Sequence, residues 1–130
     1  MHLKPPAMAS DTLHVLFICG RGISRSPTAE RIFAAPGRVE TASAGVSRDA
    51  ETAVCADLIE WADLICVMEP RHRSKLNRAF GRQLRGKRVL CLDIPDDYGF
   101  MDPELIGVLL RRLSGILEVP EDVGIAPQGD

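Results

Sequence analysis

The sequence predicts an α/β protein with a four-stranded parallel sheet and helices on both of its faces. Two observations support this fold class. Short apolar runs rich in β-branched residues recur four times, and segments with helical periodicity lie between them. Alternation of this kind is typical of parallel sheets, because two parallel strands need a crossover connection and the helices then cover both faces. With 130 residues, 45% of them hydrophobic, the chain is long enough for one domain with a real core.

In the first half of the chain, the strands are predicted at His14–Ile18 and Val39–Ala44. The helix between them is expected to begin with Ser26 as N-cap and Pro27 at its first position. It should end before Pro36, which a glycine follows.

In the second half, a helix at Thr52–Trp61 precedes a strand at Leu64–Met68, and a basic helix at Arg71–Phe80 precedes a strand at Val89–Leu92. Asp102 is expected to cap the last helix, because a proline and an acidic residue follow it directly. The apolar residues of this helix should form one stripe, at Leu105, Val108, Leu109 and Ile116.

Both chain ends are predicted to lie outside the domain. The single domain is expected at residues 12–118, between a flexible leader at 1–11 and a flexible tail at 119–130, since proline is frequent at both ends and the tail adds glycines and acids. No apolar run of about 18 residues is present, which argues against a membrane partner. The net charge of −2 implies no general attraction to polyanions.

One loop carries most of the chemical information. Cys19 ends the first strand, a loop with two glycines follows, and Arg25 precedes the expected helix start. Loop amides and a helix N-terminus favour an anion, and an arginine can add two parallel hydrogen bonds to a phosphate. The same positive field favours the thiolate, which is the nucleophilic form of cysteine. The loop is therefore predicted to bind a phosphoryl group and transfer it to sulfur. The alternative is a buried structural cysteine at a strand end, because Cys-x5-Arg by itself is a weak motif.

The other cysteines, Cys55, Cys66 and Cys91, are interpreted as structural residues of a helix face or strand. They show neither a Cys-x-x-Cys pair nor the spacing of metal ligands, so neither a metal nor another cofactor is expected. A cysteine nucleophile fits a reducing compartment, which suggests the cytoplasm. No catalytic part is expected for His14 or His72.

The segment Arg71–Arg88 contains eight Lys/Arg residues, one histidine and no acid. It can be a solvated helix face, or it can dock an acidic protein segment or a nucleic acid. Nucleic acid is disfavoured, because no aromatic residues are interleaved for base stacking.

Three motifs together resemble those of the low-molecular-weight protein tyrosine phosphatases. They are the loop from Cys19 to Pro27, the triplet Ser43-Ala44-Gly45, and the sequence Ile94-Pro95-Asp96-Asp97-Tyr98. The likeness extends over about residues 14–117, and two later runs are similar to a compact bacterial branch of predicted phosphatases: Leu58–Asp63 with Val67–Glu69, and Met101–Leu105.

The resemblance implies a phosphatase-like fold and a metal-independent hydrolysis of phosphomonoesters through a phosphocysteine on Cys19. Arg25 would bind the phosphate oxygens, and Ser26 would stabilise the thiolate, although helix capping alone also accounts for a serine there. The substrate is expected to contact the loop at Gly20, Arg21, Gly22, Ile23 and Ser24. For Arg21, an exposed solvated side chain is the alternative.

A general acid is required to protonate the leaving group. Asp96 matches the catalytic aspartate of the family, while Asp97 and Asp102 remain alternatives. The aromatic ring of a phosphotyrosine is expected beside Tyr98, which is favoured over Phe100 and for which local packing is the alternative role.

The loop departs from the family pattern at three positions. Arg21 replaces a glycine, Gly22 an asparagine and Ser24 a second cysteine, and Gly22 is expected in the left-handed conformation. The interval between Cys19 and Asp96 is also shorter than in the family.

The expected activity is therefore that of a protein tyrosine phosphatase acting on a phosphorylated protein or a small aryl phosphate, and Ile23 is the residue type of the tyrosine-directed members. Two alternatives remain: a catalytically weak phosphate-binding or docking module, and an arsenate reductase. The reductase is less favoured, because Cys55 and Cys66 do not form an evident redox pair.

Overall fold

The computed structural model describes residues 12–117 and confirms the predicted α/β class. Its four-stranded sheet is parallel throughout, in the order β2-β1-β3-β4. The strands are β1 (Leu13–Cys19), β2 (Val39–Gly45), β3 (Leu64–Val67) and β4 (Arg88–Cys91). The helices are α1 (Arg25–Phe33), α2 (Ala56–Trp61), α3 (Pro70–Phe80) and α4 (Pro103–Leu113).

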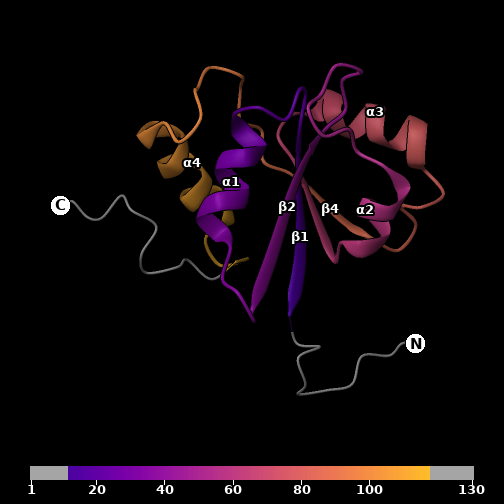
Figure 1. Cartoon of the computed structure of the whole chain (residues 1–130), viewed down its shortest axis with the longest axis horizontal. Coiled ribbons are helices and arrows are strands. Elements are labelled where there is room, and N and C mark those ends of the chain that lie inside the picture. The colour runs from indigo at the N-terminus through magenta and orange to yellow at the C-terminus, as the bar shows by residue number, and fades with distance from the viewer. Residues whose placement is uncertain (1–11, 118–130) are drawn as a thin grey trace.

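The helices cover the two faces of the sheet in pairs. Figure 1 shows α1 and α4 on one side of the strands and α2 and α3 on the other. Side chains alternate along the central strand β1, so Val15 and Phe17 belong to the core beneath α1 and α4, whereas Leu16 and Ile18 belong to the core beneath α2 and α3. Residues 15–19 of β1 are buried on both faces, which agrees with their uninterrupted apolar sequence.

The prediction for α2 is wrong at its beginning. The helix starts at Ala56, whereas the sequence predicts residues 52–61. The residues before it run beside the end of β2: the Gly45 N–H donates to the Thr52 carbonyl, and the Val54 N–H donates to the Gly45 carbonyl. These two hydrogen bonds hold the segment extended, which no local helical periodicity reveals.

The prediction for the start of α1 is also wrong. Its N-cap is Ser24 rather than Ser26, which lies in the first turn of the helix. The Ser26 hydroxyl lies 3.1 Å from the Cys19 sulfur, so it faces the cysteine instead of the helix amides.

The capping of α4 by Asp102 is confirmed. Its carboxylate accepts the N–H of Glu104 at 2.9 Å. Of the predicted stripe, Leu105 and Leu109 are fully buried, but Ile116 lies beyond the helix end and is 38% exposed. The predicted leader 1–11, residue 118 of the predicted domain and the tail 119–130 lie outside the described residues.

The strand order determines where a ligand can bind. The chain passes from β1 outward to β2 on one side, and then to β3 and β4 on the other. In open parallel sheets of this kind, the crevice beyond the carboxyl ends of the strands is the usual ligand site. Cys19 ends β1 at this edge, and Glu69 follows β3 there.

Candidate active site

Cys19 lies at the carboxyl end of β1, and the following residues 20–25, here called the anion loop, fold over its sulfur. The Gly22 N–H donates to the Cys19 sulfur at 3.2 Å, and the Ser26 hydroxyl lies 3.1 Å from the same sulfur. Cys19 is only 3% exposed. Hydrogen-bond donors aimed at a sulfur stabilise its anionic form, so the arrangement suits a nucleophilic thiolate.

Two glycines allow the anion loop to pack against the end of β2. Gly22 adopts φ +74°, the left-handed conformation expected from the sequence. A Cβ at Gly45 would lie 2.5 Å from the Gly20 carbonyl oxygen, which is closer than real atoms approach. The glycine of the Ser43-Ala44-Gly45 triplet is therefore required by the backbone of the anion loop.

Arg25 is a buried cation held on two sides. Its Nη1 donates to the Glu69 carboxylate at 2.5 Å and to the Ile94 carbonyl at 2.7 Å. The residue is 2% exposed, and its Nε has no hydrogen-bond partner among the described residues. A buried guanidinium nitrogen without a hydrogen bond is costly, so its place in the same cavity wall as Cys19 is what an anion site would require.

Glu69 provides the counter-charge for Arg25. Hydrogen bonding from Arg71, with further hydrogen bonding and charge attraction from Arg25, lowers the pKa of Glu69 to about 2. The carboxylate is thus charged at neutral pH and fixes the direction of the Arg25 guanidinium. Sequence reasoning did not single out this residue, although its place directly after a buried strand was an available signal.

His72 lies in the wall of the same site, where no role was expected from the sequence. It is fully buried, and its Nδ1 accepts the Glu69 N–H at 3.1 Å. Burial, followed by repulsion from Arg25, lowers the pKa of His72 to about 4. The imidazole is therefore neutral at pH 7 with its proton on Nε2, and this nitrogen has no partner among the described residues.

Among the three aspartates considered, Asp96 lies beside Arg25 and lines the same cavity as Cys19. Its Oδ1 lies 3.7 Å from Arg25 Nε, and its loop is attached to the sheet by the Ile94 N–H, which donates to the Met68 carbonyl at 2.7 Å. Asp102 instead caps α4, and Asp97 does not line the cavity. The geometry thus favours Asp96 among the three aspartates considered.

A cavity of about 900 Å³ opens above the anion loop. Of the predicted site residues, all but the buried Ser26 line it. Its walls are formed by Cys19, Gly20, Arg21, Gly22, Ile23, Ser24, Arg25, Val46, Ser47, Arg71, His72, Ser74, Lys75, Arg78, Asp96, Tyr98, Gly99 and Phe100. Part of the lining is apolar and aromatic (Ile23, Tyr98 and Phe100), and another part, contributed by α3, is basic.

The remaining cysteines differ in environment. Burial raises the pKa of Cys66 to about 12, so this thiol is an inert part of the core, whereas Cys55 is exposed before α2. Within residues 12–117, no three histidine, cysteine or acidic side chains gather as a metal site. None of the helices in this part of the chain is long and apolar enough to cross a membrane.

The fold matches several solved phosphatase structures. The tyrosine phosphatase AmsI of Erwinia amylovora is 26% identical, with a TM-score of 0.63 over 78% of this chain and 88% of that one. The low-molecular-weight protein tyrosine phosphatase SP-PTP of Streptococcus pyogenes is 15% identical, with a TM-score of 0.62 over 82% and 95%. The arginine phosphatase YwlE of Geobacillus stearothermophilus is 22% identical, with a TM-score of 0.61 over 78% and 90%.

By sequence, no family model and no curated protein matches the chain. Fold and loop together define an α/β protein with a Cys-x5-Arg loop at the end of its first strand. The fold is that of the low-molecular-weight protein tyrosine phosphatases, as the resemblance of the motifs implied.

Proposed function

We propose that this protein hydrolyses phosphomonoesters, with phosphotyrosine as its substrate class, through a covalent intermediate on Cys19. The observation that carries the proposal is the buried guanidinium of Arg25, whose Nε has no hydrogen bond, in the same cavity as a sulfur that already receives a backbone N–H. An anion at this place would be bound by the loop amides, by the N-terminus of α1 and by Arg25.

In the first step, the Cys19 thiolate attacks phosphorus, and the bond between phosphorus and the leaving oxygen breaks. The Asp96 carboxyl group gives its proton to that oxygen, so a neutral phenol leaves. Arg25 and the loop amides stabilise the charge that builds up on the phosphoryl oxygens. Ser26 keeps its hydroxyl at the sulfur throughout.

In the second step, water attacks the phosphocysteine and the bond between phosphorus and sulfur breaks. The Asp96 carboxylate takes a proton from the water, and inorganic phosphate leaves with the thiolate restored. Every proton and electron pair is accounted for by Cys19, Asp96, water and the substrate.

The apolar wall supports an aryl substrate. Ile23 is 45% exposed and Phe100 51% exposed, and both line the cavity together with Tyr98. A phosphotyrosine ring could pack between such side chains. Comparing turnover of phosphotyrosine and phosphoarginine therefore tests the substrate class.

The activity itself is tested with a chromogenic aryl phosphate in the presence of a chelator. We expect phenol release that persists with chelator and disappears in Cys19→Ser, and that falls roughly 100-fold or more in Asp96→Asn. Loss of turnover in Asp102→Asn with Asp96→Asn unaffected would reverse the assignment of the acid. If the wild-type protein binds phosphate but releases no phenol, a phosphate-binding module is the better description. Thiol-dependent reduction of arsenate would instead indicate an arsenate reductase.

A further inference from the structure

The basic wall of the cavity belongs to one face of α3. Arg71, Lys75 and Arg78 are spaced four and three residues apart, which places their side chains on the same side of a helix. All three are exposed and line the cavity. We call these three residues the basic face of α3.

Two of the three cations on this face have no partner among the described residues. Arg71 is paired with Glu69 at 2.8 Å, but Lys75 and Arg78 make no ion pair and no side-chain hydrogen bond with the described residues. Among the described residues that line the cavity, Asp96 is the one acidic residue, and it lies beside Arg25. The two free cations therefore have no acidic neighbour in the cavity wall to offset them.

The basic face leads away from the phosphate site. The N-terminal end of α3 is joined to the anion loop, because Glu69 binds Arg25 and His72 Nε2 would lie 3.7 Å from a Cβ at Gly20. Arg71 is thus nearest to the site and Arg78 farthest from it. At about 1.5 Å per helical residue, the face spans roughly 10 Å, or about three residues of an extended peptide.

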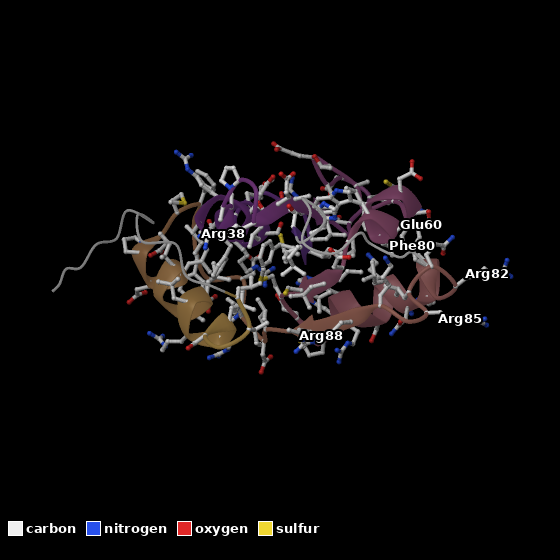
Figure 2. All side chains as sticks on the ribbon, turned by 90° about the horizontal axis from the view of Figure 1, so that it is seen from below. Arg38, Glu60, Phe80, Arg82, Arg85 and Arg88 are labelled. Carbon is white, nitrogen blue, oxygen red and sulfur yellow. The ribbon has the colours of Figure 1, made fainter. Side chains whose placement is uncertain are left out.

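We propose that the basic face of α3 binds acidic residues that flank the phosphotyrosine of a protein substrate. This specificity rests on the proposed phosphatase function and narrows its substrates to acidic phosphopeptides. Of the basic residues between Arg71 and Arg88, the proposal assigns the contact with the acidic residues to those that line the cavity. Arg82 and Arg85 lie beyond the helix end, where Figure 2 shows their side chains pointing away from the molecule.

The experiment compares two phosphotyrosine peptides of equal length, one with three acidic residues on each side of the phosphotyrosine and one with glutamine and serine there. We expect kcat/KM to be roughly tenfold higher for the acidic peptide at low ionic strength, about threefold for each exposed ion pair. The preference should decline as NaCl shortens the range of the attraction. In the double variant Lys75→Gln/Arg78→Gln, the ratio between the two peptides should fall close to one.

The matched control is Arg82→Gln/Arg85→Gln, which removes the same charge from the same segment outside the cavity. It should keep both the peptide ratio and the turnover of a small aryl phosphate. Equal kcat/KM for the two peptides overturns the proposal, as does an equal loss of preference in both double variants. Competition by a short single-stranded oligonucleotide that depends on Lys75 and Arg78, without any peptide preference, overturns it in favour of nucleic acid.

Turnover of the aryl phosphate and its loss in Cys19→Ser report on the phosphatase reaction independently of these ratios. Affinity of the Cys19→Ser variant for the two peptides supplies a second measurement. If the protein binds acidic peptides more tightly without hydrolysing any phosphate ester, the reaction fails and the specificity stands. If it hydrolyses the aryl phosphate and treats both peptides alike, the specificity fails and the reaction stands.

Discussion

Arg25 shows how a side chain can be fixed in direction before the proposed anion binds. Its Nη1 is occupied by Glu69 and by the Ile94 carbonyl, so the guanidinium plane has a fixed direction. Ordering a free arginine on binding would cost rotamer entropy, and this cost is avoided when the side chain is already buried and bonded. Glu69 is therefore a positioning residue, which acts through Arg25.

The first prediction concerns the substitution Glu69→Gln. Loss of a charged hydrogen bond to a buried guanidinium should reduce kcat/KM for an aryl phosphate by roughly ten- to a hundredfold. Steady-state kinetics together with the affinity for inorganic phosphate check this expectation. Glu60→Gln, an exposed acid on α2 that Figure 2 shows at the edge of the molecule, is the control and should behave as wild type. Normal phosphate affinity in Glu69→Gln would show that Arg25 holds its direction without this partner.

The second prediction concerns the pH dependence of stability. His72 has a pKa of about 4 in the folded protein, below its ordinary value of 6.5. Its contribution to stability is therefore fully present above pH 6.5 and is lost as pH falls toward 4, where the unfolded chain binds a proton that the folded one excludes. The carboxylate of Glu69 loses its contribution at lower pH, from about 4.5 to about 2.

Between pH 4.5 and 6.5 the free energy of unfolding should consequently fall with decreasing pH. The slope should correspond to the uptake of about one proton by His72 on unfolding. In His72→Gln, whose amide oxygen can still accept the Glu69 N–H, this part of the slope should disappear. Urea unfolding at several pH values measures both. An unchanged slope in the variant would assign the pH dependence to other groups.

At this scale, sequence reasoning found the residues that stand close together in the chain. Cys19 and Arg25 belong to one loop, and Asp96 to one recognisable motif, so short-range patterns were sufficient to suggest them. Glu69 and His72 reach the site from the end of another strand and the helix after it. Their contribution depends on strand pairing and on a buried hydrogen bond. The place of Glu69 after a buried strand was a signal for that residue, but the local sequence offered none for His72.

Among the elements, the starts of α1 and α4 are capped in different ways. Asp102 begins α4 with a carboxylate that accepts the Glu104 N–H, whereas Ser24 begins α1 without a side-chain cap. An uncapped N-terminus leaves amide groups available, and here it lies beside the anion loop. The absence of a cap on α1 is thus consistent with an anion as the missing partner.

The third prediction follows from the cap of α4. Asp102→Ala should lower the free energy of unfolding by about 1 kcal/mol, while Asp102→Asn, which can still accept the hydrogen bond, should cost much less. Thermal or chemical denaturation compares the two variants. Aryl phosphate turnover measured below the unfolding transition should persist in both, and its loss in a stable Asp102→Ala protein would assign this aspartate to the chemistry.

The elements themselves were largely predictable, because uninterrupted apolar runs favour strands buried on both faces and a proline directly after an aspartate favours a helix start. The start of α2 was not. Thr52 and Val54 are held to the end of β2 by backbone hydrogen bonds to Gly45, so tertiary pairing overrides their local preference. Ser26 was misassigned for a similar reason, since its hydroxyl faces a sulfur seven residues earlier.

For the whole molecule, the parallel sheet brings the ends of three strands to one crevice. β1 supplies Cys19, the segment after β3 supplies Glu69, and the segment after β4 supplies Asp96. Hydrogen bonds between these segments mean that an anion bound in the crevice should stabilise the entire fold rather than one loop.

The fourth prediction is that inorganic phosphate raises the melting temperature. At a phosphate concentration 100 times its Kd, linkage contributes about 2.7 kcal/mol, which for a domain of this size corresponds to a rise of roughly 10 °C. Differential scanning calorimetry with increasing phosphate measures the effect. Arg25→Lys keeps the charge but loses the planar pair of donors, so its shift should be much smaller. An equal shift in this variant would place the bound phosphate elsewhere.

The double attachment of Arg25 has a consequence for motion. The same nitrogen contacts Glu69 at the end of β3 and the Ile94 carbonyl at the base of the segment that carries Asp96. Moving that segment outward requires breaking a hydrogen bond to Arg25, the residue that we propose binds the anion. We therefore expect that an outward movement of this segment also weakens the hold of Arg25 on the phosphate. Release of the product and entry of the next substrate would then depend on the same movement.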